Sequence, residues 1–346
     1  MKYSEGYWND VARVVPHIPN VEKLFNKSIL ITGGTGLICS GIVDVLHYLN
    51  KNDGANIKII LAGRSEERTE RRFYEMKNGE DFVFCPYDAT KETEVSLDVD
   101  FIIHGASNAN PAAYVAQPVE TMEANFIGLN NLLKLCVACK AERLLYLSSS
   151  EVYGQKDNMD PFFEGDYGFL DILNERASYP SSKRAAETLC VAYGLEYGLD
   201  TVMVRPGHIY GPAVIPSDNR ATAQFTRNAV KNEDIVMKSA GTQLRSYCYF
   251  LDSASAILTV LINGETANAY NISNPNSIIT ISEIAKWIAK AAGTNLTFEN
   301  PDDMEAKGYN LMSNSSLDSK KLESLGWAAE FSPEEGALGC VKYYSD

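Results

Sequence analysis

A glycine-rich turn, Gly33-Gly34-Thr35-Gly36, separates an apolar run at residues 28–32 from an amphipathic pattern that follows it directly. Gly33 permits a tight turn, and Gly36 allows the backbone to approach a phosphate closely. At the amino end of a helix, unpaired N–H groups and the helix dipole favour a negatively charged group. Cys39 stands where a third glycine is usual, so helix and strand must pack around a small side chain there. The turn predicts a strand–turn–helix unit that binds a dinucleotide pyrophosphate.

Short apolar runs alternate with amphipathic patterns along the chain up to about residue 206, as in consecutive βαβ units. Strands are expected at residues 28–32, 57–63, 82–87, 100–107, 143–149 and 201–207, and helices at 36–50, 116–139 and 179–198. This order predicts an α/β fold of the Rossmann type, with a doubly wound parallel sheet.

Three regions are expected. Residues 1–26 form an N-terminal helical extension packed on the main body, residues 27–206 form a Rossmann NAD(P)-binding domain, and residues 207–346 form a smaller α/β substrate-binding lobe. Helices are expected in this lobe near 219–231, 252–262 and 280–292. An interleaved division between the last two regions stays open.

Composition excludes several classes of function. The net charge of −14 argues against binding to nucleic acid or to an anionic membrane. No apolar run approaches the roughly 20 residues that span a bilayer, and the first residues lack the pattern of a secretion signal. The seven cysteines show no metal-ligand spacing, although Cys136 and Cys139 form a CxxC within a helical pattern. We expect reduced thiols, no metal and a cytoplasmic location.

The end of the second predicted strand bears on the choice between NAD and NADP. An acidic residue there would bind the ribose hydroxyls of NAD, whereas this chain has Arg64 and Ser65, which suit the 2′-phosphate of NADP. NADP is therefore favoured slightly. Asp88, after the third predicted strand, can accept a hydrogen bond from the adenine amino group or can cap a turn.

A serine-rich strand end and a tyrosine–lysine pair supply the predicted catalytic groups. Ser149 lies at the end of the strand predicted at 143–149, and Tyr179 and Lys183 are one helical turn apart. A lysine ammonium and a positively charged nicotinamide near the phenol favour the phenolate. Lowering a tyrosine pKa from ~10 to ~7 takes ~4 kcal/mol, which two close cations in a partly desolvated site can supply.

Together, the stretches TGGTGLI, SSSEVYG, YPSSK and RPGHIYGP resemble the extended short-chain dehydrogenase/reductases that modify nucleotide sugars, over about residues 27–262. The resemblance implies that Tyr179 takes a proton from a sugar hydroxyl, C4 in most members, while hydride passes to the cofactor. It also implies that Ser149 hydrogen-bonds the reacting oxygen and that Lys183 holds the nicotinamide ribose. Cell-surface polysaccharide synthesis is the usual setting of such enzymes.

The same resemblance implies two sets of binding residues. The cofactor is expected along Gly33, Thr35, Gly36, Leu37, Ile38, Arg64, Ser65, Asp88, Ala89, Gly105, Ala106, Ser107, Asn125, Ser148, Tyr179, Lys183, Pro206, His208 and Ile209. The nucleotide-sugar substrate is expected along Asn108, Tyr114, Ser150, Arg176, His208, Arg220, Gln224 and Arg245.

Three reactions can follow oxidation, because a 4-keto sugar can lose a C6 carboxylate, lose water across C5–C6, or take hydride back on its other face. Glu151 can serve as an auxiliary acid or base at C5, or can bind a neighbouring backbone N–H instead. The segments HGASNANPAAYVAQPVETMEANFIG and RASYPSSKRAAETL most resemble UDP-glucuronate decarboxylases, and Arg245 matches the arginine that those enzymes present to the substrate. A guanidinium can hold a carboxylate through two hydrogen bonds. Decarboxylation is the first expectation, with 4,6-dehydration second and 4-epimerisation third.

Some positions depart from the decarboxylases. They carry prolines and a serine where this chain has Asn108-Ala109-Asn110-Pro111, and His208 replaces their usual asparagine. The preference for NADP also differs from their NAD, and it keeps a dehydratase of the GDP-mannose type as the next alternative. A non-catalytic, NAD(P)-sensing protein of the same fold could dispense with Tyr179 and Lys183.

A homodimer is expected through a contact of four helices. The predicted helices at about 116–139 and 178–197 carry apolar residues on more than one side, so each has a face left for a partner. The family resemblance implies the same assembly.

Overall fold

The computed structural model describes residues 1–346 apart from 93–96, 110, 157, 215–217, 300–311 and 345–346. Its central element is a seven-stranded sheet in the order β10-β6-β5-β4-β1-β2-β3, with every neighbouring pair parallel. The strands are β1 (Ser28–Thr32), β2 (Lys58–Gly63), β3 (Phe82–Pro86), β4 (Phe101–His104), β5 (Arg143–Leu147), β6 (Thr201–Pro206) and β10 (Asn268–Ile272). The predicted doubly wound α/β fold is confirmed.

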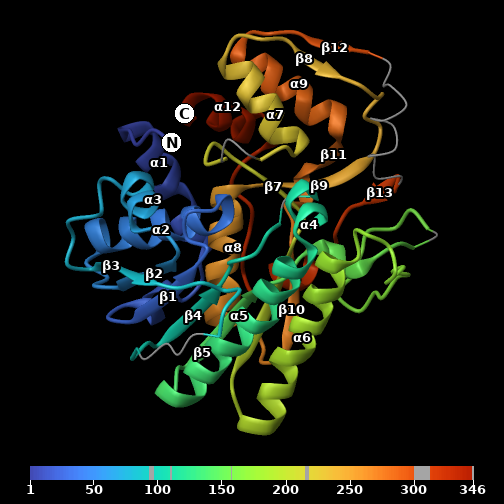
Figure 1. The fold of residues 1–346 in the computed structure, drawn as a ribbon. Helices are drawn as coiled ribbons and strands as arrows, with labels where there is room; N and C mark the ends of the chain where they lie inside the picture. The colour runs from blue at the N-terminus through green and yellow to red at the C-terminus, as the bar shows by residue number, and fades with distance from the viewer. Residues whose placement is uncertain (93–96, 110, 157, 215–217, 300–311, 345–346) are drawn as a thin grey trace.

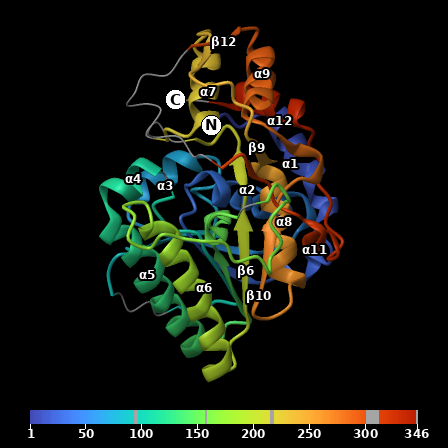
Figure 2. The same cartoon turned by 90° about the vertical axis from the view of Figure 1, so that its right-hand side faces the viewer.

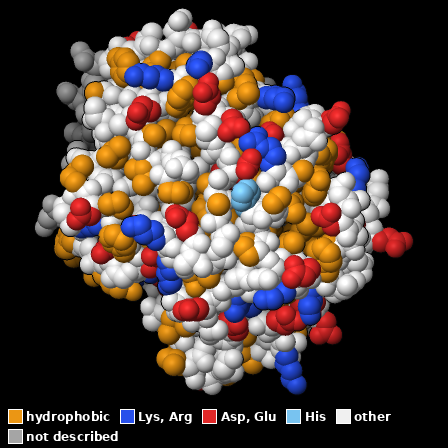
Figure 3. Space-filling model, turned by 180° about the vertical axis from the view of Figure 1, so that it is seen from behind, with side chains coloured by type: hydrophobic (Ala, Val, Ile, Leu, Met, Phe, Trp, Pro, Cys, Tyr) orange, Lys and Arg blue, Asp and Glu red, His pale blue; other side chains and the backbone are white. Residues whose placement is uncertain are grey.

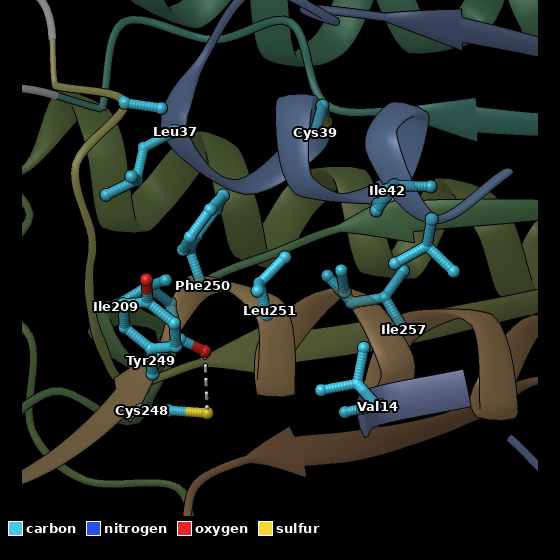
Figure 4. Packing of buried hydrophobic residues seen from close by; sticks show 14 of the residues in the cluster. Val14, Leu37, Cys39, Ile42, Ile209, Cys248, Tyr249, Phe250, Leu251 and Ile257 are labelled. Atoms are coloured by element: carbon cyan, nitrogen blue, oxygen red, sulfur yellow. Dashed lines mark hydrogen bonds between the residues drawn. The ribbon is translucent and has the colours of Figure 1, made fainter. Parts of the chain in front are cut away.

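Different helices cover the two faces of the sheet, because successive strand residues point to opposite sides. On β1, Ile29 and Ile31 belong to the core that includes α2 (Leu37–Asp53) and α8 (Phe250–Asn263). Leu30 belongs instead to the core that includes α5 (Pro118–Cys139) and α6 (Ser178–Tyr197). Figure 1 shows α5 and α6 side by side on one face, and Figure 4 shows α2 and α8 packed together on the other.

Two strands end earlier than predicted. β4 stops at His104 and β5 at Leu147, so residues 105–107 and 148–149 leave the sheet at its carboxyl edge. The helix predicted at 116–139 is α5, which starts at Pro118, and a short helix that was not predicted, α4 (Pro111–Ala116), precedes it. Proline suits the first turn of a helix, because its missing N–H would have no partner there. These early strand ends place polar loops where ligands bind in such folds.

Chain beyond residue 206 also contributes to the sheet. β10 pairs in parallel with β6, and α8 packs against α2. The remaining chain forms a smaller lobe above the carboxyl edge of the sheet (Figures 1 and 2). Its elements are α7 (Ala221–Val230), α9 (Ile281–Ala292), α12 (Pro333–Tyr343), β7 (His208–Tyr210), β8 (Ile235–Met237), β9 (Leu244–Tyr249), β11 (Ile278–Thr280), β12 (Leu296–Phe298) and β13 (Asn314–Ser315). The sheet and the lobe are thus interleaved along the sequence.

The N-terminal segment forms α1 (Glu5–Val14), which packs against α2 and α8. Its apolar face is buried through Tyr7, Val11 and Val14, and Figure 4 shows Val14 beside α8. The two chain ends lie close together (Figure 1). The Tyr343 hydroxyl of α12 donates to Asp10 Oδ2 of α1 at 2.7 Å.

Smaller elements complete the fold. They are α3 (Glu66–Arg72), α11 (Lys320–Glu323), η1 (Val15–His17), η2 (Val21–Leu24), η3 (Ser150–Tyr153) and η4 (Pro275–Ser277).

All seven cysteines are free. Within the described residues, no helix is long and apolar enough to cross a membrane, and no three potential ligands are grouped as a metal site. Figure 3 shows acidic and basic side chains intermixed over one face.

Candidate active site

The glycine turn has the backbone that a dinucleotide requires. Gly33 adopts a φ of +70°, and a Cβ there would lie 2.7 Å from the backbone of Gly105. Gly36 is the N-cap of α2 and has no side-chain capping bond. The first N–H groups of α2 therefore face the turn without a side-chain acceptor, as a pyrophosphate site requires. Thr35 belongs to the same turn, and Leu37 and Ile38 are the first two residues of α2.

Cys39 packs where the third glycine is usual. Its side chain is buried, and a Cβ added to Gly105 would overlap its sulfur. Glycine at position 105 thus supplies the space that Cys39 takes up, and helix and strand remain in close contact. Burial raises the pKa of the Cys39 thiol to about 12, so it is a packed thiol rather than a reactive one.

Three polar side chains around this turn fit a bound dinucleotide. Ser107 Oγ, Asn125 Oδ1 and Ser148 Oγ are buried and have no hydrogen-bond partner among the described residues. Asn125 is held by its amide, which donates to Ser182 Oγ at 3.0 Å. Ser107 and Ser148 follow the ends of β4 and β5, and Asn125 lies on α5. Buried polar atoms are normally paired, so these groups suit a ligand rich in hydroxyl and amide groups. Of the other predicted cofactor residues, Ala89 follows β3, Gly105 and Ala106 follow β4, Pro206 ends β6, and Ile209 lies on β7.

The adenosine end of the predicted site lies at the β2–α3 turn. Arg64 is exposed, and Ser65 caps α3 by accepting from the Arg68 N–H at 3.2 Å. Asp88 adopts the turn-capping arrangement: it accepts from Thr90 N at 3.1 Å and from Thr90 Oγ1 at 2.8 Å. The hydrogen bond from the Thr90 backbone is the main reason that the pKa of Asp88 is lowered.

The structure brings Ser149, Tyr179 and Lys183 together. Ser149 is the N-cap of η3, and its hydroxyl also forms a hydrogen bond with Tyr179. Tyr179 is 5% exposed in the first turn of α6. One turn later, Lys183 Nζ donates to the Leu147 carbonyl at 2.6 Å and lies 5.6 Å from the centre of the Tyr179 ring. Backbone and helix geometry therefore fix all three side chains.

The pKa values of the pair differ from the sequence-based expectation. Burial raises the pKa of Tyr179 to about 12, although the hydrogen bond with Ser149 acts to lower it. Burial also lowers the pKa of Lys183 to about 7, because a buried ammonium loses its hydration. In the protein alone Lys183 is thus only partly charged near neutral pH, and burial is the largest influence on the pKa of the Tyr179 phenol. The sequence analysis expected two cations near the Tyr179 phenol, and the second of them is the positively charged nicotinamide of a bound cofactor.

Tyr114 packs against Tyr179, and Arg176 contacts Tyr114. The Tyr114 and Tyr179 rings are stacked, with centroids 5.1 Å apart. Arg176 Nη2 donates to the Tyr114 hydroxyl at 3.2 Å. Both residues were predicted to line the substrate cleft, and the structure places them next to Tyr179.

A pocket opens beside this group, lined by Ser150, Glu151, Gly154, Phe162, His208, Met312 and Ser315. The Glu151 and His208 side chains reach solvent, yet the pocket walls desolvate them. Desolvation raises the pKa of Glu151, against the opposing effects of Arg176 and Arg245. It lowers the pKa of His208 to about 3, assisted by Arg245 and Arg220, so the imidazole is neutral. The pocket combines a protonatable carboxyl, a neutral imidazole and nearby arginines.

Arg245 lies on β9 and is 4% exposed. Its Nη1 donates to the carbonyls of Leu244 and Met312, at 2.8 and 3.1 Å. Burial lowers the pKa of Arg245 overall, although Tyr247 and Glu151 act to raise it. A guanidinium held in this way, close to a carboxyl, suits the binding of an anionic substrate group.

The other predicted substrate residues are less central. The charge of Arg220 is close enough to Tyr179 to interact electrostatically, but its guanidinium donates to both carboxylate oxygens of the buried Asp218. Gln224 is exposed on α7, and Asn108 is half-buried in the loop after β4. Asn110 lies outside the described residues.

The pocket also contains residues that the sequence analysis missed. Phe162 pairs through an isolated bridge with Leu317, which brings the loop before α6 next to chain near the C-terminus. Met312 and Ser315 come from that same distant segment. No motif marks these positions, because they are joined to the site only by tertiary packing.

Comparisons with known proteins show the family of this chain. The family model of the NAD dependent epimerase/dehydratase family matches residues 29–273. UDP-glucuronic acid decarboxylase 6 of Arabidopsis thaliana is 31% identical over 314 residues, which are 90% of this chain and 87% of that protein. UDP-glucuronic acid decarboxylase 1 of Xenopus tropicalis is 29% identical, over 95% of this chain and 75% of that protein.

Solved structures show the same fold. UDP-glucose 4-epimerase of Thermotoga maritima, with UDP-glucose, superposes with a TM-score of 0.75 at 22% identity, covering 91% of this chain and 98% of that one. DesIV, a dTDP-glucose 4,6-dehydratase of Streptomyces venezuelae with NAD bound, gives a TM-score of 0.77 at 23% identity, covering 92% and 96%. With a family model that matches most of its length and a glycine turn, serine, tyrosine and lysine in place, this chain belongs to the NAD-dependent epimerase/dehydratase family of extended short-chain dehydrogenase/reductases, whose members act on nucleotide sugars.

Proposed function

We propose that this protein decarboxylates UDP-glucuronate after oxidising the sugar at C4. The observation that carries the proposal is the position of Glu151 in the pocket beside Tyr179. Arg176 and Arg245 are close enough there for their charges to act on the pKa of its carboxyl. Arginines close to a carboxyl that lines the pocket suit a carboxylated sugar. The curated relatives named above are UDP-glucuronic acid decarboxylases.

The first step needs a base and a hydride acceptor. A bound nicotinamide dinucleotide supplies the acceptor, and it can return the hydride later. Ser149 holds the reacting hydroxyl, and Tyr179 takes the hydroxyl proton as hydride leaves C4. Lys183 stabilises the phenolate when it is charged, and its carbonyl contact with Leu147 keeps it one helical turn from the tyrosine.

The second step uses the ketone at C4. The C6 carboxylate is then β to a carbonyl, so the C5–C6 bond can break with its electrons moving into the ketone, releasing carbon dioxide and an enolate. Arg245 holds the carboxylate before it leaves. Glu151, whose pKa is raised, delivers a proton to C5. Tyr179 returns its proton to O4 as hydride returns to C4.

A 4,6-dehydratase is the second candidate. Arg64 is exposed at the β2–α3 turn next to the hydroxyl of Ser65, a pair suited to the 2′-phosphate of NADP, and Glu151 could then act as the base at C5 of a neutral hexose. We propose a preference for NADP on the same observation. A 4-epimerase is third, since Glu151 has no necessary role in epimerisation.

Mass spectrometry of the products tests the proposal. The purified protein, supplied with NAD or NADP, is incubated separately with UDP-glucuronate and with nucleotide hexoses. Loss of carbon dioxide from UDP-glucuronate supports the decarboxylase, and loss of water from a hexose supports the dehydratase. An unchanged mass with a new retention time supports the epimerase. Absence of any change in a folded, cofactor-loaded protein rejects all three.

We also propose a homodimer formed by α5 and α6. Their exposed apolar side chains include Val119, Met122 and Phe126 on α5 and Leu195 and Tyr197 on α6. Pairing these helices with those of a second copy would cover such a surface. Seven free cysteines are consistent with a reducing compartment such as the cytoplasm, where we propose that the protein works.

A further inference from the structure

A buried cluster joins the N-terminal segment to the helix that follows β2. We call Tyr3, Tyr7, Asp44 and Arg72 the Asp44 cluster. The Asp44 side chain of α2 is 0% exposed and accepts three hydrogen bonds. They come from the Tyr3 hydroxyl at 2.7 Å, the Tyr7 hydroxyl at 2.5 Å and Arg72 Nη2 at 2.8 Å. Arg72 also donates to the Tyr3 hydroxyl. One carboxylate therefore links the N-terminal segment, α2 and α3.

The chemistry of the cluster makes it a strong link. Burial raises the pKa values of Tyr3 and Tyr7, so both phenols stay protonated and donate to the carboxylate. Burial acts to lower the pKa of Arg72, but Asp44 and the tyrosines raise it above its ordinary value. Removing one member of such a buried set leaves the others without a partner, and that loss is costly.

Helix α3 buries few of its own residues, although Phe73 and Met76 just after it are buried in the main core. Of its seven residues, Thr69 alone is buried, and Arg72 at its carboxyl end is partly buried in the cluster. Just beyond it, the Tyr74 ring lies 5.2 Å from the Tyr3 ring, and Glu75 accepts from Trp8 Nε1 at 3.3 Å. The N-terminal segment thus contacts α3 and the residues after it at several points.

The other end of α3 lies at the predicted adenosine site. Ser65 is the N-cap of α3, and Arg64 precedes it at the end of β2. A short helix transmits a shift at one end to the other, because its backbone hydrogen bonds keep it rigid. The position of Arg64 and Ser65 is therefore tied to the contacts of Arg72.

We propose that residues 3–14 position α3 through the Asp44 cluster and so hold the β2–α3 turn for the adenosine half of the cofactor. Tyr3 and Tyr7 are positioning residues that act through Arg72. The inference rests on the cofactor site of the proposed function, but it does not depend on which sugar is converted.

A matched pair of variants tests it. Tyr3→Phe and Tyr343→Phe each remove one phenol hydroxyl and keep the ring. Tyr3 binds Asp44, whereas Tyr343 binds Asp10 and so ties α1 to α12 rather than to α3. The dissociation constant of ADP-ribose, measured by calorimetry, is expected to rise about 3- to 10-fold in Tyr3→Phe, the loss of roughly one hydrogen bond. Tyr343→Phe should keep the wild-type value.

Hydrogen exchange supplies a readout that needs no cofactor. The amides of residues 66–72 should exchange faster in Tyr3→Phe than in Tyr343→Phe. In steady-state kinetics, Tyr3→Phe should raise the KM for the cofactor and leave kcat unchanged. Arg72→Met, which breaks the link from the α3 side, should also weaken ADP-ribose binding. Equal ADP-ribose affinity in Tyr3→Phe and wild type, or equal losses in Tyr3→Phe and Tyr343→Phe, overturns the proposal. A protein that binds ADP-ribose normally but converts no nucleotide sugar contradicts the proposed function alone.

Discussion

The ring of Tyr114 lies nearly parallel to the ring of Tyr179, with their planes 12° apart and their centroids separated by 5.1 Å. Tyr114 is in turn held by Arg176, whose guanidinium donates to its hydroxyl. The Tyr179 phenol, the proposed base, is therefore oriented from two sides, by this stack and by Ser149. Orientation of a reacting group within a fraction of an ångström strongly affects rate.

Replacing Tyr114 by leucine should lower kcat by about 2- to 10-fold, since an aromatic pair is worth roughly 0.5–1.5 kcal/mol beyond its buried area. Tyr114→Phe keeps the ring and loses only the contact with Arg176, so its kcat should remain near the wild-type value. Steady-state kinetics with saturating substrate and cofactor provides the measurement. Equal losses in the two variants would show that the hydroxyl matters and the stack does not.

Tyr179→Phe should abolish turnover, with a loss of about 10²–10⁴-fold or more, because the base that accepts the hydroxyl proton is gone. The ring and its stacking on Tyr114 remain, so the dissociation constants of cofactor and nucleotide sugar should stay within a few-fold of wild type. Product assays and calorimetry measure the two effects separately. Full biological activity in this variant would instead favour a non-catalytic, NAD(P)-sensing protein.

The parts of the site that the sequence predicted are those encoded by local patterns. Gly33 follows a strand and precedes a helix, and Tyr179 and Lys183 share a helical face, so short-range geometry determines where they lie. The sheet could be predicted for the same reason: each strand is an apolar run followed by a helical pattern. Hydrophobic periodicity carries this information without any knowledge of tertiary contacts.

The parts that could not be predicted depend on contacts between distant segments. β10 is read from sequence as part of the smaller lobe, yet its pairing with β6 places it in the main sheet. Phe162 enters the pocket through its bridge to Leu317, and Asp218 neutralises Arg220. The pKa of Tyr179 is also a tertiary property, because burial of the side chain is the main cause that raises it.

Lys183 should make the stability of the protein without cofactor depend on pH. Its folded pKa of about 7 is below the ~10.4 of an unfolded lysine. Between these values the unfolded state binds more protons, so the contribution of Lys183 to the unfolding free energy rises with pH, by up to about 1.4 kcal/mol per unit. Urea denaturation of wild type and Lys183→Met at pH 7, 8 and 9 measures it. The difference between wild type and variant should shift in favour of wild type as pH rises, and a constant difference would contradict the lowered pKa.

Arg245→Lys should weaken binding of a carboxylated sugar much more than binding of a neutral one. Lysine keeps the charge but cannot form two parallel hydrogen bonds to a carboxylate. We expect the KM for UDP-glucuronate to rise by about tenfold or more, with a much smaller change in the dissociation constant of UDP-glucose, which has a hydroxymethyl group at C6. Similar losses for the two ligands would place Arg245 near the shared diphosphate rather than near C6.

The choice between NADP and NAD can be tested at Ser65 without disturbing α3. Ser65 caps the helix by accepting from the Arg68 N–H, and aspartate is an equally good N-cap. Ser65→Asp therefore keeps the cap while it places a carboxylate next to the ribose, where it repels a 2′-phosphate and accepts from a free hydroxyl. The ratio of the NADP and NAD dissociation constants should shift toward NAD by about tenfold or more. Ser65→Asn, a neutral residue that also caps, is the control and should shift the ratio much less. If the ratio in Ser65→Asp equals that of wild type, the turn does not contact the 2′ position, and the preference for NADP inferred from Arg64 and Ser65 is wrong.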